Sequence, residues 1–223
     1  NYPGFPDGVN GTDLASKMQE QAKHFGLEVL NASVENIKLE GKTKHIKINS
    51  SQIYTSKALI IASGSDSVKL NVPGEDNLRG KGVSYCATCD GPLFKNVSIA
   101  VIGGGDSALE EALFLTRFAK SVTIVHRRDS LRAVKILQDR ALSNEKIKFI
   151  WNSVVAEIQG ANSVERLILK NVQTGEKENF ICDGVFVYVG LKPNTAFLNG
   201  IIKINEYGYI ITDENLESSS PGI

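Results

Sequence analysis

Residues 97–108 read VSIAVIGGGDSA, and this stretch decides the fold. The apolar run before the glycines is typical of a parallel strand that is buried on both faces. An amphipathic helix is predicted over 106–119, and a second strand with its exit over 121–128. A strand, a helix and a strand within about 30 residues make a βαβ unit. We therefore predict an α/β protein built on a parallel sheet.

The glycine turn of this unit predicts nucleotide binding. Gly103, Gly105 and Ala108 fit the pattern G-x-G-x-x-G/A between a strand and a helix, which is where the pattern has meaning. The two glycines permit a tight turn and the approach of a pyrophosphate, and the helix N-terminus adds free N–H groups. The predicted contacts are Gly103, Gly104, Gly105, Asp106, Ser107 and Ala108. The alternative is an ordinary strand–helix turn with spare glycines.

The exit of the second strand indicates which dinucleotide binds. A site for NAD usually carries Asp or Glu there, bonded to the ribose hydroxyls. This chain instead carries four basic side chains, His126, Arg127, Arg128 and Arg132. Arginines match a 2′-phosphate with paired hydrogen bonds, so we predict NADPH. Asp129 is a competing signal, and a solvated basic face is the alternative interpretation.

A C-x-x-C pair lies directly ahead of the βαβ unit. The spacing of Cys86 and Cys89 lets their sulfurs close a small ring that opens to a dithiol. Asp90 could protonate a departing thiolate, and a helix cap or turn carboxylate is the competing interpretation. A disulfide accepts two electrons and NADPH delivers a hydride, so a relay between them is expected, and a flavin fits this role.

The pair could instead hold a metal or be purely structural. Zinc needs two more ligands, but no second C-x-x-C exists, and His24, His45 and His126 show no ligand spacing. We therefore expect no metal site. The third cysteine, Cys182, lies in an apolar strand-like run and is interpreted as a small buried hydrophobe.

Charge and hydropathy exclude other classes of protein. Lys plus Arg is 25 and Asp plus Glu is 25, so the balanced charge gives no general affinity for nucleic acid or anionic membranes. No apolar run approaches the roughly 18 residues of a membrane helix, and no signal peptide opens the chain. We expect a cytoplasmic protein without nucleic-acid or membrane partners.

Two stretches rich in Pro and Gly, 72–80 and 190–194, are candidate domain boundaries. Ahead of the first, we predict a helix over 12–25 that is capped by Thr12 and ended by Gly26. The strands predicted there are 27–30, 45–49 and a buried strand over 58–64. After the βαβ unit we predict a helix over 133–142, a strand over 147–152, and period-two strands over 154–160, 163–172, 178–184 and 184–190, with a hairpin turn at 173–176.

The motifs C-A-T-C-D-G at 86–91, G-G-G-D-S-A at 103–108 and H-R-R-D-S-L-R at 126–132 occur in this order. With them, the chain resembles the low-molecular-weight, bacterial-type thioredoxin reductases. The resemblance runs nearly end to end and includes NYPGFPDG, ALIIASG, VFVYVGLKPNT and SSPGI. It implies an oxidoreductase that moves electrons from NADPH through FAD and the Cys86–Cys89 disulfide to thioredoxin. It also implies a homodimer that serves redox homeostasis.

The resemblance further implies two Rossmann-like, three-layer nucleotide-binding domains. An NADPH domain over 72–191, which carries the cysteine pair, is inserted into a discontinuous FAD domain made of 1–71 and 192–223. Nicotinamide and disulfide both need the one flavin and cannot occupy its face together. The inserted domain is therefore expected to rotate about its two connections.

Individual roles follow from the same resemblance. Cys86 would attack thioredoxin, Cys89 would lie next to the flavin, and Asp90 would be the general acid. Arg127, Arg128 and Arg132 would hold the 2′-phosphate. The expected FAD contacts are Asn1, Val34, Ala62, Ser63 and Gly64, and Gly190 is a further cofactor-binding candidate. Ser63 stands where the family usually has Thr, which keeps the hydroxyl.

The chain also departs from the family pattern. The first FAD fingerprint, a G-x-G-x-x-G near the N-terminus, is absent, and so is the Gly-Asp segment that follows the final PGI turn. The chain opens without Met and stops within a turn. We therefore expect an internal fragment that lacks both FAD-binding termini and holds flavin weakly or not at all.

Three other functions stay open. The flavoprotein subunit of an alkyl hydroperoxide reductase shares the core but adds a thioredoxin-like domain at its N-terminus. A flavin-dependent dithiol oxidase keeps C-x-x-C but should lose the NADPH site, whereas this chain retains the glycines and arginines. A non-catalytic NADPH-binding redox module would bind nucleotide without turnover.

Overall fold

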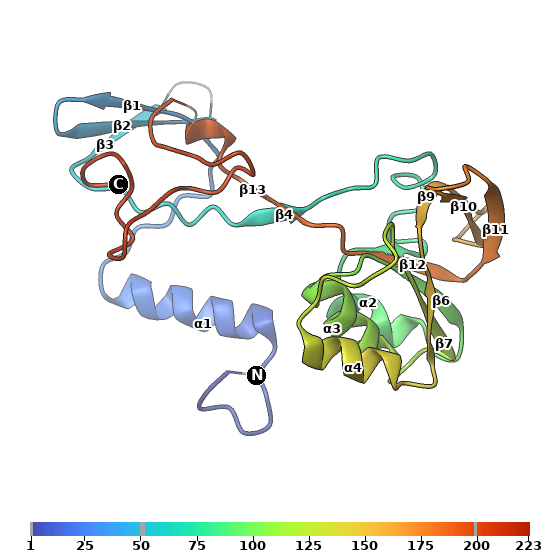
Figure 1. The fold of residues 1–223 in the computed structure, drawn as a ribbon. Coiled ribbons are helices and arrows are strands. Elements are labelled where there is room, and N and C mark those ends of the chain that lie inside the picture. The colour runs from blue at the N-terminus through green and yellow to red at the C-terminus, as the bar shows by residue number, and fades with distance from the viewer. Residues whose placement is uncertain (1, 50–51, 199) are drawn as a thin grey trace. The chain divides into compact units, whose positions relative to one another are not determined.

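The computed structural model describes residues 2–49, 52–198 and 200–223. The chain forms two compact units. The first unit comprises residues 1–61, 195–205 and 210–223, and the second unit comprises 62–194 and 206–209. Figure 1 colours both units along the chain and labels elements in each of them. Each unit has a buried core of its own.

The first unit begins with helix α1, Gly11–His24. The helix predicted over 12–25 is confirmed, but its cap is not Thr12. The side chain of Asn10 accepts a hydrogen bond from the Thr12 backbone N–H at 2.9 Å. Thr12 lies inside the first turn, where its N–H is one of the donors that a cap has to satisfy. Gly26 follows the helix in the left-handed conformation, with φ +89°, as predicted.

An antiparallel sheet of three strands follows α1. Its strands, in the order β1-β2-β3, are β1 (Val34–Glu40), β2 (Thr43–Ile48) and β3 (Gln52–Ser56). The chain returns to this unit with the 3-10 helix η3, Ala196–Leu198, whose Leu198 packs with Ile37 of β1 in the core. The strand predicted over 45–49 is thus confirmed as part of β2.

The strands predicted over 27–30 and 58–64 are wrong. Neither segment pairs with any strand in the part of the chain that the structure describes. Ile60, near the middle of the second segment, is 91% exposed. Leu59 instead donates its backbone N–H to the Gly222 carbonyl at 2.9 Å. A buried strand needs hydrogen-bonded neighbours along both edges, and an apolar sequence supplies only the side chains for it.

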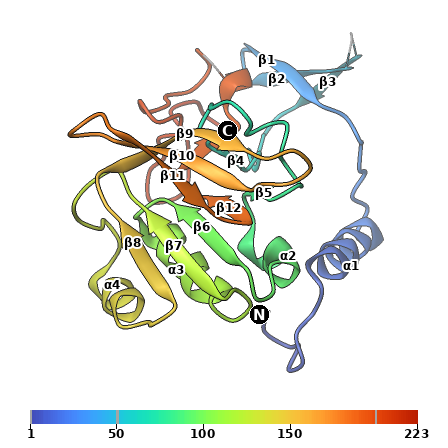
Figure 2. The same ribbon diagram turned by 90° about the vertical axis from the view of Figure 1, so that its right-hand side faces the viewer.

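The second unit is built on a five-stranded parallel sheet in the order β5-β12-β6-β7-β8. Its strands are β5 (Val83–Ser84), β12 (Gly184–Val187), β6 (Ser98–Ile102), β7 (Ser121–Val125) and β8 (Ile147–Ile150). The predicted βαβ unit is confirmed as β6, helix α3 (Asp106–Leu115) and β7, which lie side by side in Figure 2. The predicted α/β fold with a parallel sheet is therefore confirmed.

Alternating side chains of the parallel sheet face two different layers. Ile99 and Val101 of β6 pack with α3 and with helix α4 (Lys135–Leu142). Ala100 and Ile102 pack with an antiparallel sheet instead. In the order β11-β10-β9, that sheet contains β9 (Ser153–Gln159), β10 (Arg166–Asn171) and β11 (Lys177–Ile181). The second unit thus has helices, a parallel sheet and an antiparallel sheet as its three layers.

Helix α3 is shorter than predicted. α3 ends at Leu115, before the predicted end at 119, because the Arg117 and Phe118 N–H groups bond three residues back in tighter turns. No helix within the described ranges is both long enough and apolar enough to cross a membrane.

A two-stranded ribbon flanks the parallel-sheet region of the second unit. β4 (Ser65–Ser67) pairs antiparallel with β13 (Leu191–Pro193), and the Val68 N–H extends the pairing to the Gly190 carbonyl at 3.0 Å. The second unit therefore starts before the ribbon, at Ala62, whereas the predicted domain boundaries lie at 71/72 and 191/192. The assignment of FAD and NADPH to separate domains stays a prediction.

Candidate functional site

A cleft of about 830 Å³ opens in the second unit at the carboxyl ends of the parallel strands. Open α/β sheets bind their ligands at this edge. Three turns converge here: the glycine turn after β6, the exit of β7 and the exit of β12. The predicted residues that line the cleft are Gly103, Gly104, Gly105, Asp106, Ser107, Ala108, His126, Arg127, Arg132 and Gly190. The fold thus gathers residues that are far apart in the sequence.

The three consecutive glycines meet three different environments. A Cβ on Gly103, whose φ is +151°, would lie 2.5 Å from the Tyr188 carbonyl oxygen. A Cβ on Gly104 would overlap the imidazole ring of His126. A Cβ on Gly105 would meet nothing within 4 Å. The first two glycines therefore let protein pack against the turn, and Gly105 leaves open space that a pyrophosphate can occupy.

The start of α3 faces the same turn. Gly105 is the N-cap and has no side chain to satisfy the N–H groups of the first turn. Asp106 turns its carboxylate aside, because Oδ1 accepts a hydrogen bond from the Val134 N–H at 2.7 Å. The Arg132 N–H donates to the Gly104 carbonyl at 2.7 Å. These bonds hold the loop before α4 against the glycine turn. The N–H groups at the N-terminus of α3 therefore remain available to bind an anion.

Two of the three predicted arginines line the cleft. Arg127 and Arg132 belong to its lining, whereas Arg128 does not. The Arg128 carbonyl accepts the Asn152 N–H at 3.1 Å, which ties this residue to the loop after β8. The described cleft therefore offers Arg127 and Arg132 to a phosphate.

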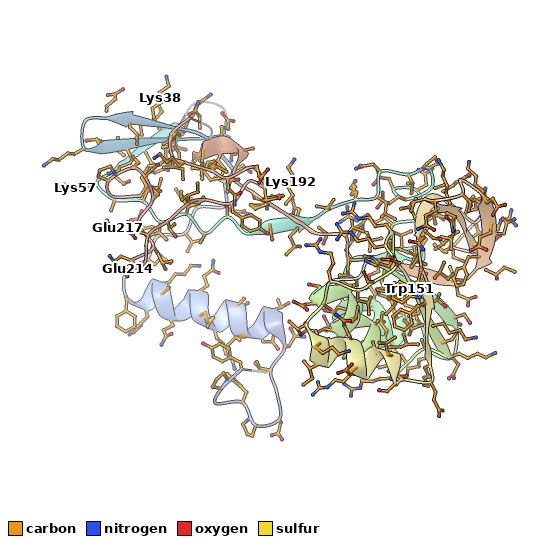
Figure 3. All side chains as sticks on the ribbon, viewed as in Figure 1. Lys38, Lys57, Trp151, Lys192, Glu214 and Glu217 are labelled. Carbon is orange, nitrogen blue, oxygen red and sulfur yellow. A yellow bond between two sulfur atoms is a disulfide. The ribbon has the colours of Figure 1, made fainter. Side chains whose placement is uncertain are left out.

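His126 forms part of the cleft floor. Its side chain is buried, and Nε2 has no hydrogen-bond partner among the described residues. The ring meets that of Trp151 edge to face at 6.4 Å, and Figure 3 labels Trp151. Burial, together with the charges of the neighbouring arginines, lowers the pKa of His126. The imidazole is therefore neutral at pH 7. It contributes packing against Trp151 and the unpaired Nε2 to the cleft, and no positive charge.

Cys86 and Cys89 form a disulfide on the short helix α2, Ala87–Asp90. The two Cα atoms are 5.3 Å apart, and the Cys89 N–H donates to Cys86 Sγ at 3.2 Å. Cys86 is half-buried and Cys89 is exposed. Cys182 is a free, buried cysteine, and burial raises the pKa of its thiol to about 12. The redox-capable sulfurs are therefore those of the C-x-x-C pair.

Asp90 is connected to the disulfide through Ser84, a residue that the sequence analysis missed. The Ser84 hydroxyl donates to Asp90 Oδ2 at 2.7 Å and accepts the Cys86 N–H at 3.1 Å. Ser84 itself is 4% exposed. Ser84 thus links the Asp90 carboxylate to the backbone of Cys86, and the general-acid role of Asp90 stays a prediction.

Tyr188 and Glu111 are also cleft residues that the sequence analysis missed. The Tyr188 hydroxyl accepts the Ala87 N–H of α2 at 2.7 Å, so this side chain touches both the cleft and the redox helix. Burial raises the pKa of Tyr188 to about 12, which keeps its hydroxyl protonated. Burial, followed by the charge of Glu110, also raises the pKa of Glu111. Tyr188 lies within the VFVYVGLKPNT stretch of the family resemblance, but no residue pattern marks either Tyr188 or Glu111 as a cleft residue.

The predicted flavin contacts are divided between the two units. Asn1 lies outside the described residues. Val34 is the first residue of β1 in the first unit and is exposed. The other three, Ala62, Ser63 and Gly64, are exposed in the second unit and do not line the cleft. The cleft of the second unit therefore fits a dinucleotide, and the flavin contacts stay a prediction.

Comparisons with known sequences agree with this geometry. The model of the family described as pyridine nucleotide-disulphide oxidoreductase matches residues 5–223. The thioredoxin reductase of Streptomyces coelicolor is 47% identical over 213 residues, which are 96% of this chain and 66% of that protein. The bifunctional thioredoxin reductase/thioredoxin of Mycobacterium leprae is 47% identical over 220 residues, which are 99% of this chain and 48% of that protein. The chain thus spans less than two thirds of these relatives.

Solved structures give the same result. The crystal structure of Lactococcus lactis thioredoxin reductase in the FR conformation aligns with a TM-score of 0.85 and 46% identity, over 100% of this chain and 73% of that one. The crystal structure of T. acidophilum thioredoxin reductase aligns with a TM-score of 0.81 and 34% identity, over the same shares of the two chains, 100% and 73%.

Proposed function

Because the chain belongs to the pyridine nucleotide-disulphide oxidoreductase family, whose model matches residues 5–223, we propose that it works in a thioredoxin-disulfide reductase. One observation carries the proposal: the second unit holds both a dinucleotide cleft and a C-x-x-C disulfide. Tyr188 joins the two, since it lines the cleft and bonds the helix of the cysteine pair. An enzyme that passes electron pairs from a nucleotide to a protein disulfide needs this combination.

NADPH is the proposed ligand of the cleft, where it would supply a hydride. The open space at Gly105 and the N-terminus of α3 suit the pyrophosphate. Arg127 and Arg132 suit the 2′-phosphate that distinguishes NADPH from NADH. His126 also lines the cleft, and because its imidazole is neutral it adds no positive charge beside Arg127 and Arg132.

FAD is the second proposed cofactor. Bound in the complete protein, it would relay the electron pair between NADPH and the disulfide. The steps that follow concern the cysteine pair alone. We assign the first unit to the FAD domain and the second unit to the NADPH domain by resemblance.

The reduced cysteine pair would then act by thiol–disulfide exchange. The Cys86 thiolate attacks one sulfur of the thioredoxin disulfide, that bond breaks, and the other thioredoxin sulfur leaves as a thiolate. Cys89 attacks Cys86 in the mixed disulfide, which restores the Cys86–Cys89 bond and releases the second thioredoxin thiolate. Asp90, whose carboxylate accepts the Ser84 hydroxyl, would give a proton to a leaving sulfur, and the Ser84 link to the Cys86 N–H supports this role.

The assembly and compartment of the proposal rest on the resemblance. We propose a homodimer in the cytoplasm, with thioredoxin as its protein partner. Light scattering of the full-length protein during gel filtration tests the dimer.

The direct test is NADPH oxidation by the full-length protein with thioredoxin as acceptor. Cys86→Ser should abolish thioredoxin-dependent oxidation, because it removes the attacking sulfur. Cys182→Ala is the matched control and should retain the activity, since Cys182 is buried and outside the pair. Retained turnover in Cys86→Ser would contradict the disulfide relay. Bleaching of the flavin by NADPH without transfer to thioredoxin would keep the nucleotide site and replace the partner by a peroxiredoxin-type acceptor.

A further inference from the structure

One wall of the cleft is made by the last residue of β4 and the three residues after it, which we call the linker wall. It consists of Ser67, Val68, Lys69 and Leu70, and Tyr85 continues it. Residues 68–72 belong to no helix or strand. The linker wall therefore needs support from outside its own backbone to keep a fixed position.

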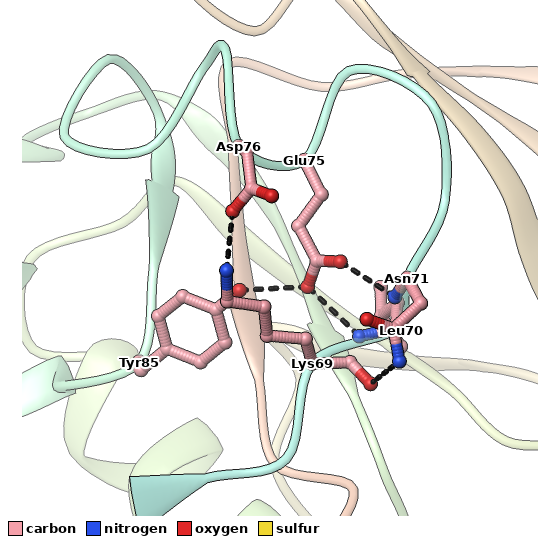
Figure 4. A network of polar contacts seen from close by, with 6 residues as sticks. All are labelled: Lys69, Leu70, Asn71, Glu75, Asp76 and Tyr85. Carbon is pink, nitrogen blue, oxygen red and sulfur yellow. Dashed lines mark hydrogen bonds and ion pairs between the residues drawn. The ribbon is translucent and has the colours of Figure 1, made fainter.

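The side chain of Glu75 supplies this support. Glu75 is 2% exposed, and its carboxylate accepts hydrogen bonds from the Leu70 N–H at 2.8 Å, the Asn71 N–H at 2.7 Å and the Tyr85 hydroxyl at 2.7 Å. Figure 4 shows the three bonds converging on the carboxylate. A buried carboxylate is tolerated only where such donors replace water. One side chain thus fixes two successive linker amides and Tyr85 together.

Tyr85 is itself held firmly. Burial, followed by the hydrogen bond to Glu75, raises the pKa of Tyr85, so its hydroxyl stays protonated and remains a donor. The Arg79 guanidinium lies over the Tyr85 ring, 5.4 Å from its centre. Tyr85 directly precedes Cys86 in the chain, so the Glu75 network also borders the redox helix.

A second carboxylate in the same loop offers a contrast. Asp76 pairs with Lys69 at 2.6 Å, but both side chains are well exposed. Exposed ion pairs contribute little, because water screens them. Figure 4 shows this pair beside the Glu75 network. Asp76 is therefore a charge-matched neighbour whose loss should leave the linker wall in place.

The sheet order tells which half of a dinucleotide meets the linker wall. Arg127 follows β7, the glycine turn follows β6, and Tyr188 and Tyr85 follow β12 and β5, which are neighbours at the other end. A 2′-phosphate at Arg127 and a pyrophosphate at the glycine turn direct the rest of the ligand toward β12 and β5. The linker wall therefore faces the nicotinamide half.

We propose that Glu75 is a positioning residue that fixes the linker wall against the nicotinamide half of the bound dinucleotide. This inference rests on the proposed function, since it takes the ligand to be NADPH. Glu75 acts through Leu70 and Tyr85 and does not itself line the cleft. Loss of the Glu75 carboxylate should weaken the binding of NADPH, because contacts to the nicotinamide half are disturbed. The binding of the adenosine half should be unaffected.

The test compares two ligands on the full-length protein by calorimetric titration. NADPH spans the whole cleft, whereas adenosine 2′,5′-bisphosphate occupies only the arginine end. In Glu75→Gln, one amide oxygen replaces two carboxylate oxygens, and an NH₂ group faces the linker amides. NADPH should therefore bind roughly tenfold more weakly. The dissociation constant of Glu75→Gln for the bisphosphate should stay within about twofold of the wild-type value. In Asp76→Asn, the dissociation constants for both ligands should stay within about twofold of wild type.

Tyr85→Phe is the milder second variant, since it removes one of the three hydrogen bonds and keeps the ring. Its affinity for NADPH should be roughly threefold lower than that of the wild type. It replaces Glu75→Gln in the test if that variant does not fold. Undiminished NADPH binding, or equal weakening of both ligands, would overturn the role of Glu75. Arg132→Ala tests the assignment of NADPH to the cleft separately from the role of Glu75, because this variant should bind both NADPH and the bisphosphate more weakly. If it weakens neither, the NADPH assignment itself is wrong.

Discussion

At the scale of single residues, substitutions of the adjacent Gly104 and Gly105 should affect different properties, stability in the first case and NADPH binding in the second. A Cβ at Gly104 would overlap the His126 ring, so Gly104→Ala should lower the free energy of unfolding by about 1–3 kcal/mol. A Cβ at Gly105 has open space, so Gly105→Ala should cost less than about 1 kcal/mol and instead weaken NADPH binding. Urea unfolding and NADPH titration of both variants measure the two effects. A strongly destabilised Gly105→Ala protein with normal affinity would contradict this assignment.

The residues that sequence predicted are those that stand in motifs. The glycine turn, Arg127 and Arg132 carry a recognisable spacing, and the structure places them in one cleft. Ser84 and Glu75 are single polar residues in ordinary surroundings, and their roles arise from contacts made only in the folded chain. No spacing rule finds such residues, because their partners are set by tertiary structure.

At the scale of elements, the cap of α1 gives a clean comparison. Asn10→Ala removes the side-chain acceptor of the Thr12 N–H and should destabilise the helix by about 1 kcal/mol. Thr12→Ala leaves that bond in place and should be neutral or slightly stabilising. No residue of α1 is buried, so helix fraying is not masked by packing. Amide hydrogen exchange within α1 measures the difference, and equal effects of the two variants would contradict the cap assignment.

The strands predicted over 97–103 and 121–128 are confirmed, and each has a paired neighbour in the structure. β6 and β7 are apolar runs that pair with each other along their whole length. The runs at 27–30 and 58–64 look similar in sequence but have no paired strand in the described part of the chain. Hydrophobicity therefore predicted which segments could be buried, whereas pairing decided which became strands.

At the scale of the whole molecule, the parallel topology explains why a cysteine pair precedes a nucleotide turn. The C-x-x-C helix follows the carboxyl end of β5, and the glycine turn follows the carboxyl end of β6. Strands of a parallel sheet end at one edge, so both features lie at the same edge. The sequence predicted each feature but not the insertion of β12 between β5 and β6, which puts Tyr188 between them.

Flavin retention is the prediction that belongs to the whole chain. Residues 1–223 contain one G-x-G-x-x-G/A turn, at 103–108, and the cleft beside it suits a dinucleotide with a 2′-phosphate. The candidate flavin contacts Val34 and Ser63 are exposed and line no part of that cleft. Purified residues 1–223 should therefore carry flavin well below one equivalent and still bind NADPH.

The measurement is flavin absorbance per protein after gel filtration in the presence of added FAD, with NADPH titration of the same sample as the folding control. The full-length protein, treated in parallel, should retain the flavin. A stoichiometric yellow complex of residues 1–223 would show that these exposed residues suffice to bind it. Loss of both ligands would mean that the second unit does not fold in residues 1–223 alone, because NADPH binding needs only the cleft of that unit.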